Sequence, residues 1–103
     1  MLFPFPFSDH RRAKPRPALI VSNDAYNATG RDVIACGLTT NLINAAHSVL
    51  VEPGDLQSGR LIATSRARAD KIFALDQSLI ATRIGVVKPG IVAAVRKEII
   101  ALL

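Results

Sequence analysis

Short apolar runs, each closed by turn-forming residues, limit the folds open to this chain more than any other feature. Residues 17–22 and 33–38 are almost continuously apolar, and residues 47–52 alternate apolar and polar side chains. Runs of this length and composition predict buried or half-buried strands. Weaker strand candidates lie at residues 60–64 and 71–75.

The segments between these runs predict turns and one unusual strand. Residues 1–7 are apolar, but Pro4 and Pro6 lack amide donors, so a strand there must be an edge or bulged strand. Polar residues 8–15 predict a loop, and the asparagines, aspartate and glycine of residues 23–31 predict a turn. Residues 76–81 are long enough for a single helical turn.

The end of the chain predicts a helix that begins near Pro89, because proline suits the first helical turn. An apolar face then recurs at helical spacing, with Arg96 and Lys97 on another face. Its members are Val92, Val95, Ile99 and Leu102. Many short strands followed by one helix predict a mainly β, α+β protein, built as a small, partly open barrel capped by that helix.

Composition narrows the class of protein. A length of 103 residues predicts a single domain over 1–103, and half of the residues are apolar, which excludes intrinsic disorder. The lone Cys36 excludes an internal disulfide framework and a cysteine-rich zinc site, and it suits a reducing compartment. No apolar stretch approaches the ~20 residues that span a bilayer, and residues 1–7 make a poor signal peptide. We therefore expect a cytoplasmic protein without a membrane partner.

The formal charge of +5 favours an anionic partner. Residues 8–16 carry a net charge of +3 and residues 60–70 a net charge of +2, so the rest of the chain is neutral. Glycine-rich phosphate loops and zinc-protease motifs are absent from the sequence. We therefore expect no nucleotide cofactor and no catalytic metal.

Arg16 stands between two prolines, in Lys14-Pro15-Arg16-Pro17. A stiff backbone holds its guanidinium at low entropic cost, which suits phosphate recognition. The alternative is an ordinary surface arginine at the start of a strand. His10, Arg11 and Arg12 stand just upstream, where the alternative is a solvated basic loop.

A second cluster spans residues 66–70. In an extended segment Arg66, Arg68 and Asp70 point to one face, and Ala67 and Ala69 point to the other. Two cations and a carboxylate on one surface suit a scissile phosphate, with the carboxylate as general base. The alternative is an ordinary surface ion pair.

Four further residues need an interpretation. Thr39 and Asn41 bring a hydroxyl and an amide to the end of a strand, where the alternative is a polar turn. Cys36 lies among apolar residues, which predicts a core side chain. His47 has no carboxylate or second histidine nearby, so we do not expect a ligand role for it.

Several segments, in order, resemble the MazF/PemK family of toxin–antitoxin ribonucleases. Residues 3–9 are similar to its PFPF-T/S-D segment, and residues 14–23 to its K-x-RPALVVSN strand. Residues 35–41 are similar to the strand that ends in I-T-S-N, and residues 68–76 to the R-x-D-K-L-x-T-L-D stretch, which residues 78–80 and 84–85 continue.

The resemblance implies an SH3-like barrel of the CcdB/PemK-like class with a C-terminal helix, acting as a homodimer. It implies an endoribonuclease that cuts single-stranded RNA without a metal, and a cognate antitoxin that covers the RNA-binding surface. Arg16 corresponds to the family's loop arginine, Thr39 to its strand-end threonine, and Arg68 and Asp70 to its R-x-D pair. His10 matches a histidine found in one branch of the family.

Cleavage by a ribose 2′-hydroxyl, leaving a cyclic phosphate and a 5′-hydroxyl, needs a base, cations and an acid. We assign Asp70 as base, Arg16 and Arg68 as phosphate stabilisers of which one donates the proton, and Thr39 as a positioner. His10 is chemically better suited than arginine to the acid role. The remaining candidates for RNA binding are Arg11, Arg12, Lys14, Arg66 and Asn41.

The chain departs from the family at two points. It lacks the Gly-Asp/Glu and β-branched strand that usually precede the PFPF-like segment, so either that strand is shortened or the recorded start is internal. Lys88 replaces a serine before Pro89, which removes a good N-cap. Two alternatives stay open: a catalytically weakened homologue that binds antitoxin or RNA without cleavage, and a gyrase-targeting toxin of the same barrel class.

Overall fold

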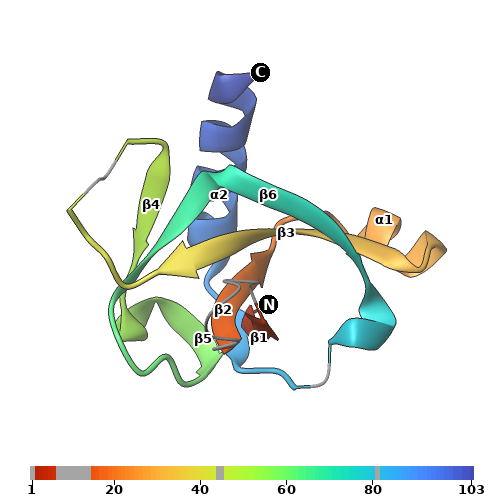
Figure 1. Ribbon diagram of the computed structural model, residues 1–103, viewed down its shortest axis with the longest axis horizontal. Helices are drawn as coiled ribbons and strands as arrows, with labels where there is room; N and C mark the ends of the chain where they lie inside the picture. Colours follow the sequence, from red (N-terminus) through yellow and green to blue (C-terminus); the bar gives the residue numbers. More distant parts are fainter. Residues whose placement is uncertain (1, 7–14, 44–45, 81) are drawn as a thin grey trace.

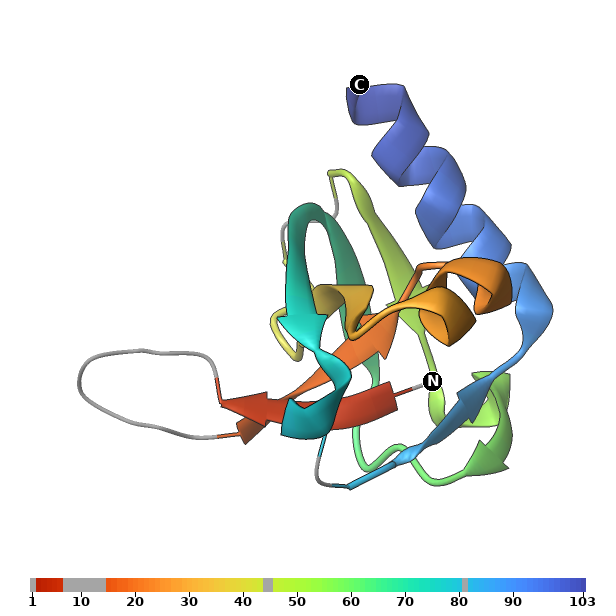
Figure 2. The same ribbon diagram turned by 90° about the vertical axis from the view of Figure 1, so that its right-hand side faces the viewer.

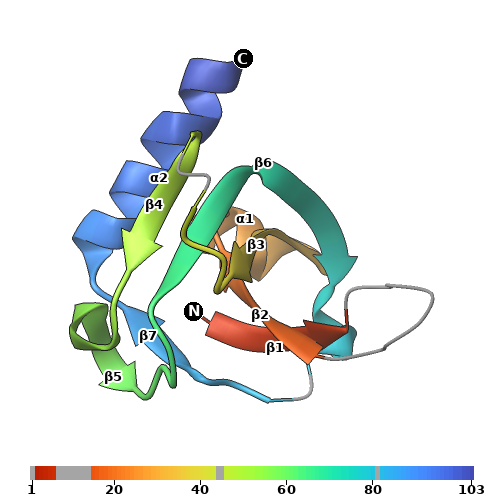
Figure 3. The same cartoon turned by 60° about the vertical axis from the view of Figure 1, so that its left-hand side comes forward.

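The computed structural model describes residues 2–6, 15–43, 46–80 and 82–103. One antiparallel sheet of seven strands dominates it, in the order β4-β6-β3-β2-β1-β7-β5 (Figure 1). The strands are β1 (Leu2–Pro6), β2 (Pro15–Ile20), β3 (Asp32–Thr39), β4 (Ser48–Val51), β5 (Leu56–Gly59), β6 (Ser65–Asp76) and β7 (Gly85–Val87). The sheet curls strongly but β4 and β5 do not pair with each other, so the predicted partly open barrel is confirmed (Figure 3).

The central strands β2 and β3 are buried on both faces. Leu19 and Cys36 belong to the main core cluster, whereas their neighbours Ala18 and Ala35 belong to a second cluster. Each of these four side chains is fully buried. A strand covered on both faces has no need of polar alternation, which explains the continuous apolar runs in the sequence.

Helix α2 (Pro89–Leu102) covers β4 and β6 on one side of the sheet, as Figure 2 shows. Val95 is fully buried, and Val92 and Ile99 pack against the same core, as the helical spacing predicts. The predicted apolar face ends sooner than expected, because Leu102 remains 40% exposed. None of the helices in the described residues is both long and apolar enough to cross a bilayer.

The prediction of a turn over residues 23–31 is wrong, because these residues contain helix α1 (Asp24–Thr29). The side-chain oxygen of Asn23 accepts a hydrogen bond of 2.8 Å from the Tyr26 backbone amide and so caps the helix. Asparagine and aspartate favour both turns and helix starts, so the same residues were open to either structure. No residue of α1 is buried.

Four strand predictions need correction. Residues 60–64 form no strand; the pairing lies earlier, in β5, which follows the short 3₁₀ turn η1 (Pro53–Asp55) and pairs with the unpredicted strand β7. The strand predicted over residues 71–75 is confirmed, but its extent needs correction, because it begins at Ser65 and includes residues 66–70 in β6. His47 precedes β4 with a φ of 54° and takes no part in the strand. The sequence predicts Pro15 in the loop and Arg16 at the end of that loop, but both residues belong to β2.

Two other local predictions are confirmed. Residues 76–81 contain the single helical turn η2 (Gln77–Leu79). Strand β1 behaves as an edge along most of its length: it pairs with β2 throughout, but with β7 only through Leu2 and Gly85. Pro4 and Pro6 therefore interrupt no second ladder.

Candidate active site

Strand β6 presents Arg66, Arg68 and Asp70 on one face. Ala67 and Ala69 are 0% and 1% exposed, whereas Arg66 and Arg68 are half-buried and Asp70 is exposed. The strand alternation expected from the sequence is thus confirmed. Because the alanines anchor one side of β6 in the core, the opposite side holds two guanidinium groups and a carboxylate at fixed positions.

Arg68 and Asp70 form a bidentate ion pair. Nε of Arg68 donates to Oδ1 at 2.9 Å, and Nη2 donates to Oδ2 at 2.6 Å. The Arg68 hydrogen bonds lower the pKa of the Asp70 carboxyl, and the same hydrogen bonds raise the pKa of Arg68. Both side chains keep about a third of their surface accessible, at 31% and 35%. The pair is therefore ionised, yet reachable by a ligand.

Arg66 lies two residues before Arg68 on the same face of β6, and it has no carboxylate partner among the described residues. Its Nη1 donates to the Ser48 hydroxyl on β4 at 3.2 Å. Its Nε is buried, and within the described part of the chain no acceptor reaches it. An unmatched guanidinium with an unused donor is the strongest source of positive potential in this cluster.

Thr39 is the direct cross-strand neighbour of Arg66, at the end of β3. Its Oγ1 accepts a hydrogen bond of 3.1 Å from the backbone amide of Asn41. Oδ1 of Asn41 in turn accepts a hydrogen bond of 3.1 Å from the backbone amide of Ile43. Among the described residues the Thr39 hydroxyl proton has no acceptor, so it can be donated to a ligand. The strand-end threonine and the β6 cations, which are far apart in sequence, therefore meet on one surface.

The remaining candidates are placed less fully. Arg16 lies on β2, two residues before Ala18, which pairs with Gly37 of β3. The paired register of β2 with β3 ends at Ala18 and Gly37, before it reaches Arg16. Four predicted residues lie outside the described ones: His10, Arg11, Arg12 and Lys14.

Ser48 was missed as a supporting residue. Its contact with Arg66 depends on the antiparallel register of β4 against β6, in which Ser48 faces Arg68. Nothing in the local sequence around Ser48 signals that pairing. In the described ranges, no three histidine, cysteine, aspartate or glutamate side chains gather where they could hold a metal ion.

Cys36 is fully buried, as predicted for a core side chain. Burial raises the pKa of its thiol to about 12. It lies in the hydrophobic core and takes no part in the charged face of β6.

The fold has close counterparts among solved structures. Mycobacterium tuberculosis toxin MazF-mt6 is 19% identical with a TM-score of 0.73, over 95% of this chain and 90% of that one. An endoribonuclease in complex with its cognate antitoxin, from a mycobacterial species, is 25% identical with a TM-score of 0.77, over 97% and 87% of the two chains. A second mycobacterial endoribonuclease is 29% identical with a TM-score of 0.69, over 84% and 78%.

Among curated protein sequences, none matches this chain significantly. A family model does match it, and the match runs over residues 1–103. That model describes PemK-like, MazF-like toxins of type II toxin–antitoxin systems, the family whose segments the sequence resembles. The chain belongs to this family.

Proposed function

We propose that this protein is the toxin of a type II toxin–antitoxin pair and acts in the cytoplasm as an endoribonuclease on single-stranded RNA, without a metal ion. The observation that carries the proposal is the row of Arg66, Arg68 and Asp70 on β6, with Thr39 directly beside Arg66. A cluster of guanidinium donors beside a hydroxyl is the arrangement that a charged phosphorane requires.

The reaction proceeds by attack of a ribose 2′-oxygen on the adjacent phosphorus. The 2′-hydroxyl proton passes to a base, the bond from phosphorus to the 5′-oxygen breaks, and that oxygen takes up a proton. The products are a 2′,3′-cyclic phosphate and a 5′-hydroxyl. Arg66 and Arg68 stabilise the extra negative charge, and Thr39 donates its free hydroxyl proton to a phosphate oxygen.

The role of Asp70 follows from its pairing. Both of its oxygens accept hydrogen bonds from Arg68, and its lowered pKa makes it a weak proton acceptor while the pair is closed. Asp70 therefore orients Arg68 in the free protein, and it serves as general base only when substrate opens the pair. Arg16 and His10 remain the candidates for stabilising the leaving side and donating its proton.

The partners follow from the charge and the comparisons. The net charge of +5 and the unpaired Arg66 support binding of a polyanion, either RNA or an acidic segment of an antitoxin. One structural neighbour is an endoribonuclease bound to its cognate antitoxin, which supports a similar partner here. We propose a homodimer on the strength of the family alone.

A cleavage assay with purified protein and single-stranded RNA, in EDTA, tests the activity. We expect cleavage, with cyclic phosphate and 5′-hydroxyl ends on the products. Arg68→Ala lowers the rate by roughly 10²–10³-fold, as for removal of one transition-state donor. Arg31→Ala, which removes an exposed arginine at the far end of β3, is the matched control and leaves the rate unchanged.

Two results contradict the proposal. Cleavage that appears only after addition of a divalent metal excludes the metal-free mechanism. Tight binding of RNA or antitoxin with no cleavage at any RNA sequence supports the weakened homologue instead.

The variant Asp70→Asn separates the two roles of Asp70. Loss of a general base lowers the cleavage rate by about 10²–10⁴-fold, whereas loss of the orientation of Arg68 alone lowers it by about tenfold.

A further inference from the structure

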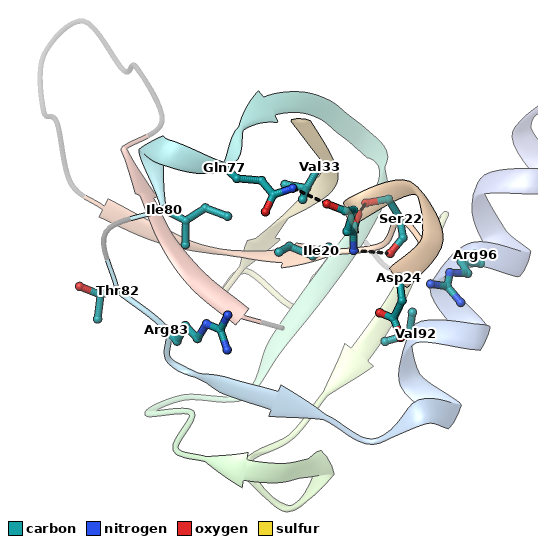
Figure 4. Close-up of a pocket in the computed structure, with 11 residues that line it drawn as sticks. Ile20, Ser22, Asp24, Val33, Gln77, Ile80, Thr82, Arg83, Val92 and Arg96 are labelled. Carbon is teal, nitrogen blue, oxygen red and sulfur yellow. Dashed lines mark hydrogen bonds between the residues drawn. The ribbon is translucent and has the colours of Figure 1, made fainter. Parts of the chain in front are cut away.

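A cavity of about 520 Å³ opens at the other end of the sheet, between α1, η2 and α2 (Figure 4). It shares no residue with the charged face of β6. Its volume falls within the range of small-molecule sites, roughly 300–1,000 Å³. Four apolar side chains from β2, β3, α2 and the segment after η2 give it an apolar wall: Ile20, Val33, Ile80 and Val92.

Gln77 brings a fixed amide to this cavity. Its Nε2 donates to the backbone carbonyl of Asn27 at 2.7 Å and contacts the carbonyl of Gly30 at 3.4 Å. These bonds to α1 and its C-terminal end settle which way the amide faces. Oε1 is left as an acceptor, and Figure 4 shows it turned away from α1 toward the side of Ile80.

Two arginines face the cavity from different elements. Nε of Arg96 donates to the Val21 carbonyl at 2.7 Å, which holds the guanidinium while its terminal nitrogens make no hydrogen bond to a described residue. Arg83 extends toward the cavity from the segment before β7 (Figure 4). Neither arginine forms an ion pair with a described carboxylate. Asp24 also lines the cavity and brings a carboxylate to it.

We infer that this cavity binds one nucleotide unit. A planar base fits the apolar wall, where the Gln77 oxygen accepts a hydrogen bond from a ring or exocyclic N–H group. The phosphate meets the guanidinium group of Arg83 at the Ile80 end of the cavity, where its paired donors suit phosphate oxygens, and Arg96 lies at the opposite end (Figure 4). The apolar wall, the oriented amide and the Arg83 cation, which has no ion-pair partner among the described residues, together favour a nucleotide over a simple anion or an apolar ligand.

The nucleotide has two possible sources, a free nucleoside monophosphate or a residue of the RNA strand. Val33 and Thr39 lie at the two ends of β3, about 20 Å apart at the usual rise of a strand. A strand of RNA cut beside Thr39 could thus place a distant nucleotide in the cavity. This second source rests on the ribonuclease function proposed above, whereas the first does not.

Nuclear magnetic resonance of isotope-labelled full-length protein tests the inference. One arm titrates AMP, GMP, CMP and UMP, and the other titrates short 2′-O-methyl oligoribonucleotides of mixed sequence, which cannot be cut because the 2′-oxygen carries no proton. We expect saturable shifts of the Gln77 side-chain amide and of the Arg83 Nε signal. A response to mononucleotides identifies a free ligand, and a response to oligonucleotides alone identifies the RNA strand.

Arg83→Ala should weaken this binding at least about tenfold, the loss expected for one charge-assisted hydrogen bond. Lys97→Ala removes an exposed cation of α2 that does not line the cavity, and it leaves the affinity unchanged apart from a small general effect of charge. Equal losses in the two variants, or ligand shifts confined to β6 and Thr39, overturn the inference. Absence of RNA cleavage with the Gln77 shifts intact contradicts the proposed function and leaves the nucleotide cavity standing.

Discussion

Arg68 and Asp70, two residues apart on β6, are joined by parallel hydrogen bonds from Nε to Oδ1 and from Nη2 to Oδ2. The spacing of two residues puts both side chains on the same face of the strand, and the guanidinium fork matches the carboxylate. The pair holds a cation in place for phosphate binding, and it also neutralises that cation. The net positive charge of the face in the described residues therefore comes from Arg66.

Stability should depend on pH through this pair. Because Arg68 lowers the pKa of Asp70 in the folded state, the contribution is present above the unfolded pKa of about 3.9 and is lost as pH falls through the lower folded value. We expect wild type to be more stable than Asp70→Asn at pH 6–7, with the difference shrinking below about pH 4. Denaturant unfolding at a series of pH values measures it.

Asp24→Asn is the control for this measurement, since Asp24 is an exposed carboxylate without an ion-pair partner among the described residues. A pH-independent difference for Asp70→Asn would mean that the ion pair makes no contribution in solution, as many exposed pairs do not.

Gly59 and Gly85 face each other across β5 and β7 at very close range. Gly59 has a φ of 80°, and a Cβ there would overlap the Ile84 carbonyl; a Cβ on Gly85 would overlap the Ser58 carbonyl. We expect Gly59→Ala and Gly85→Ala each to destabilise the protein by at least about 2 kcal/mol. Gly90→Ala, in open space on α2, should instead gain about 0.5–1 kcal/mol.

Helix α2 begins without a side-chain cap. Lys88 occupies the N-cap position in extended geometry, and its side chain makes no capping hydrogen bond. A serine in this geometry accepts a backbone amide of the first turn and removes a cation from the positive end of the helix dipole. Lys88→Ser should therefore stabilise the protein by about 1 kcal/mol in thermal or denaturant unfolding. Lys97→Ser, in the exposed middle of the helix, should lose a few tenths of that amount.

The strands that could be predicted from the sequence are those whose residues are almost all apolar. Segments 17–22 and 33–38 are apolar on both faces, because β2 and β3 separate two parts of the core. Strands β5 and β7 escaped prediction, because the close approach of Gly59 and Gly85 depends on pairing across a long loop. Helix α1 was not predicted, because the asparagine that caps a helix is also a common turn residue.

The same division applies to the candidate site. The common face of Arg66, Arg68 and Asp70 follows from strand periodicity alone, so it was predictable. The support of Arg66 by Ser48 and its position beside Thr39 require the registers of β4 and β3 against β6. The cavity at Gln77 combines residues of β2, β3, α1, α2 and the segment after η2, and no local pattern connects them.

Cys36 tests the integrity of the core in solution. Its thiol is fully buried, and burial raises its pKa to about 12, so at pH 8 only about one molecule in 10⁴ carries a thiolate. We expect iodoacetamide to leave the native protein unmodified over hours at pH 8 and to modify it within minutes in denaturant. The double variant Cys36→Ala, Ala93→Cys carries its thiol on the exposed face of α2 and should react in the native state. Equal native rates for wild type and this variant, measured by mass spectrometry, would mean that β3 opens readily and that the core around Leu19 and Cys36 is not closed.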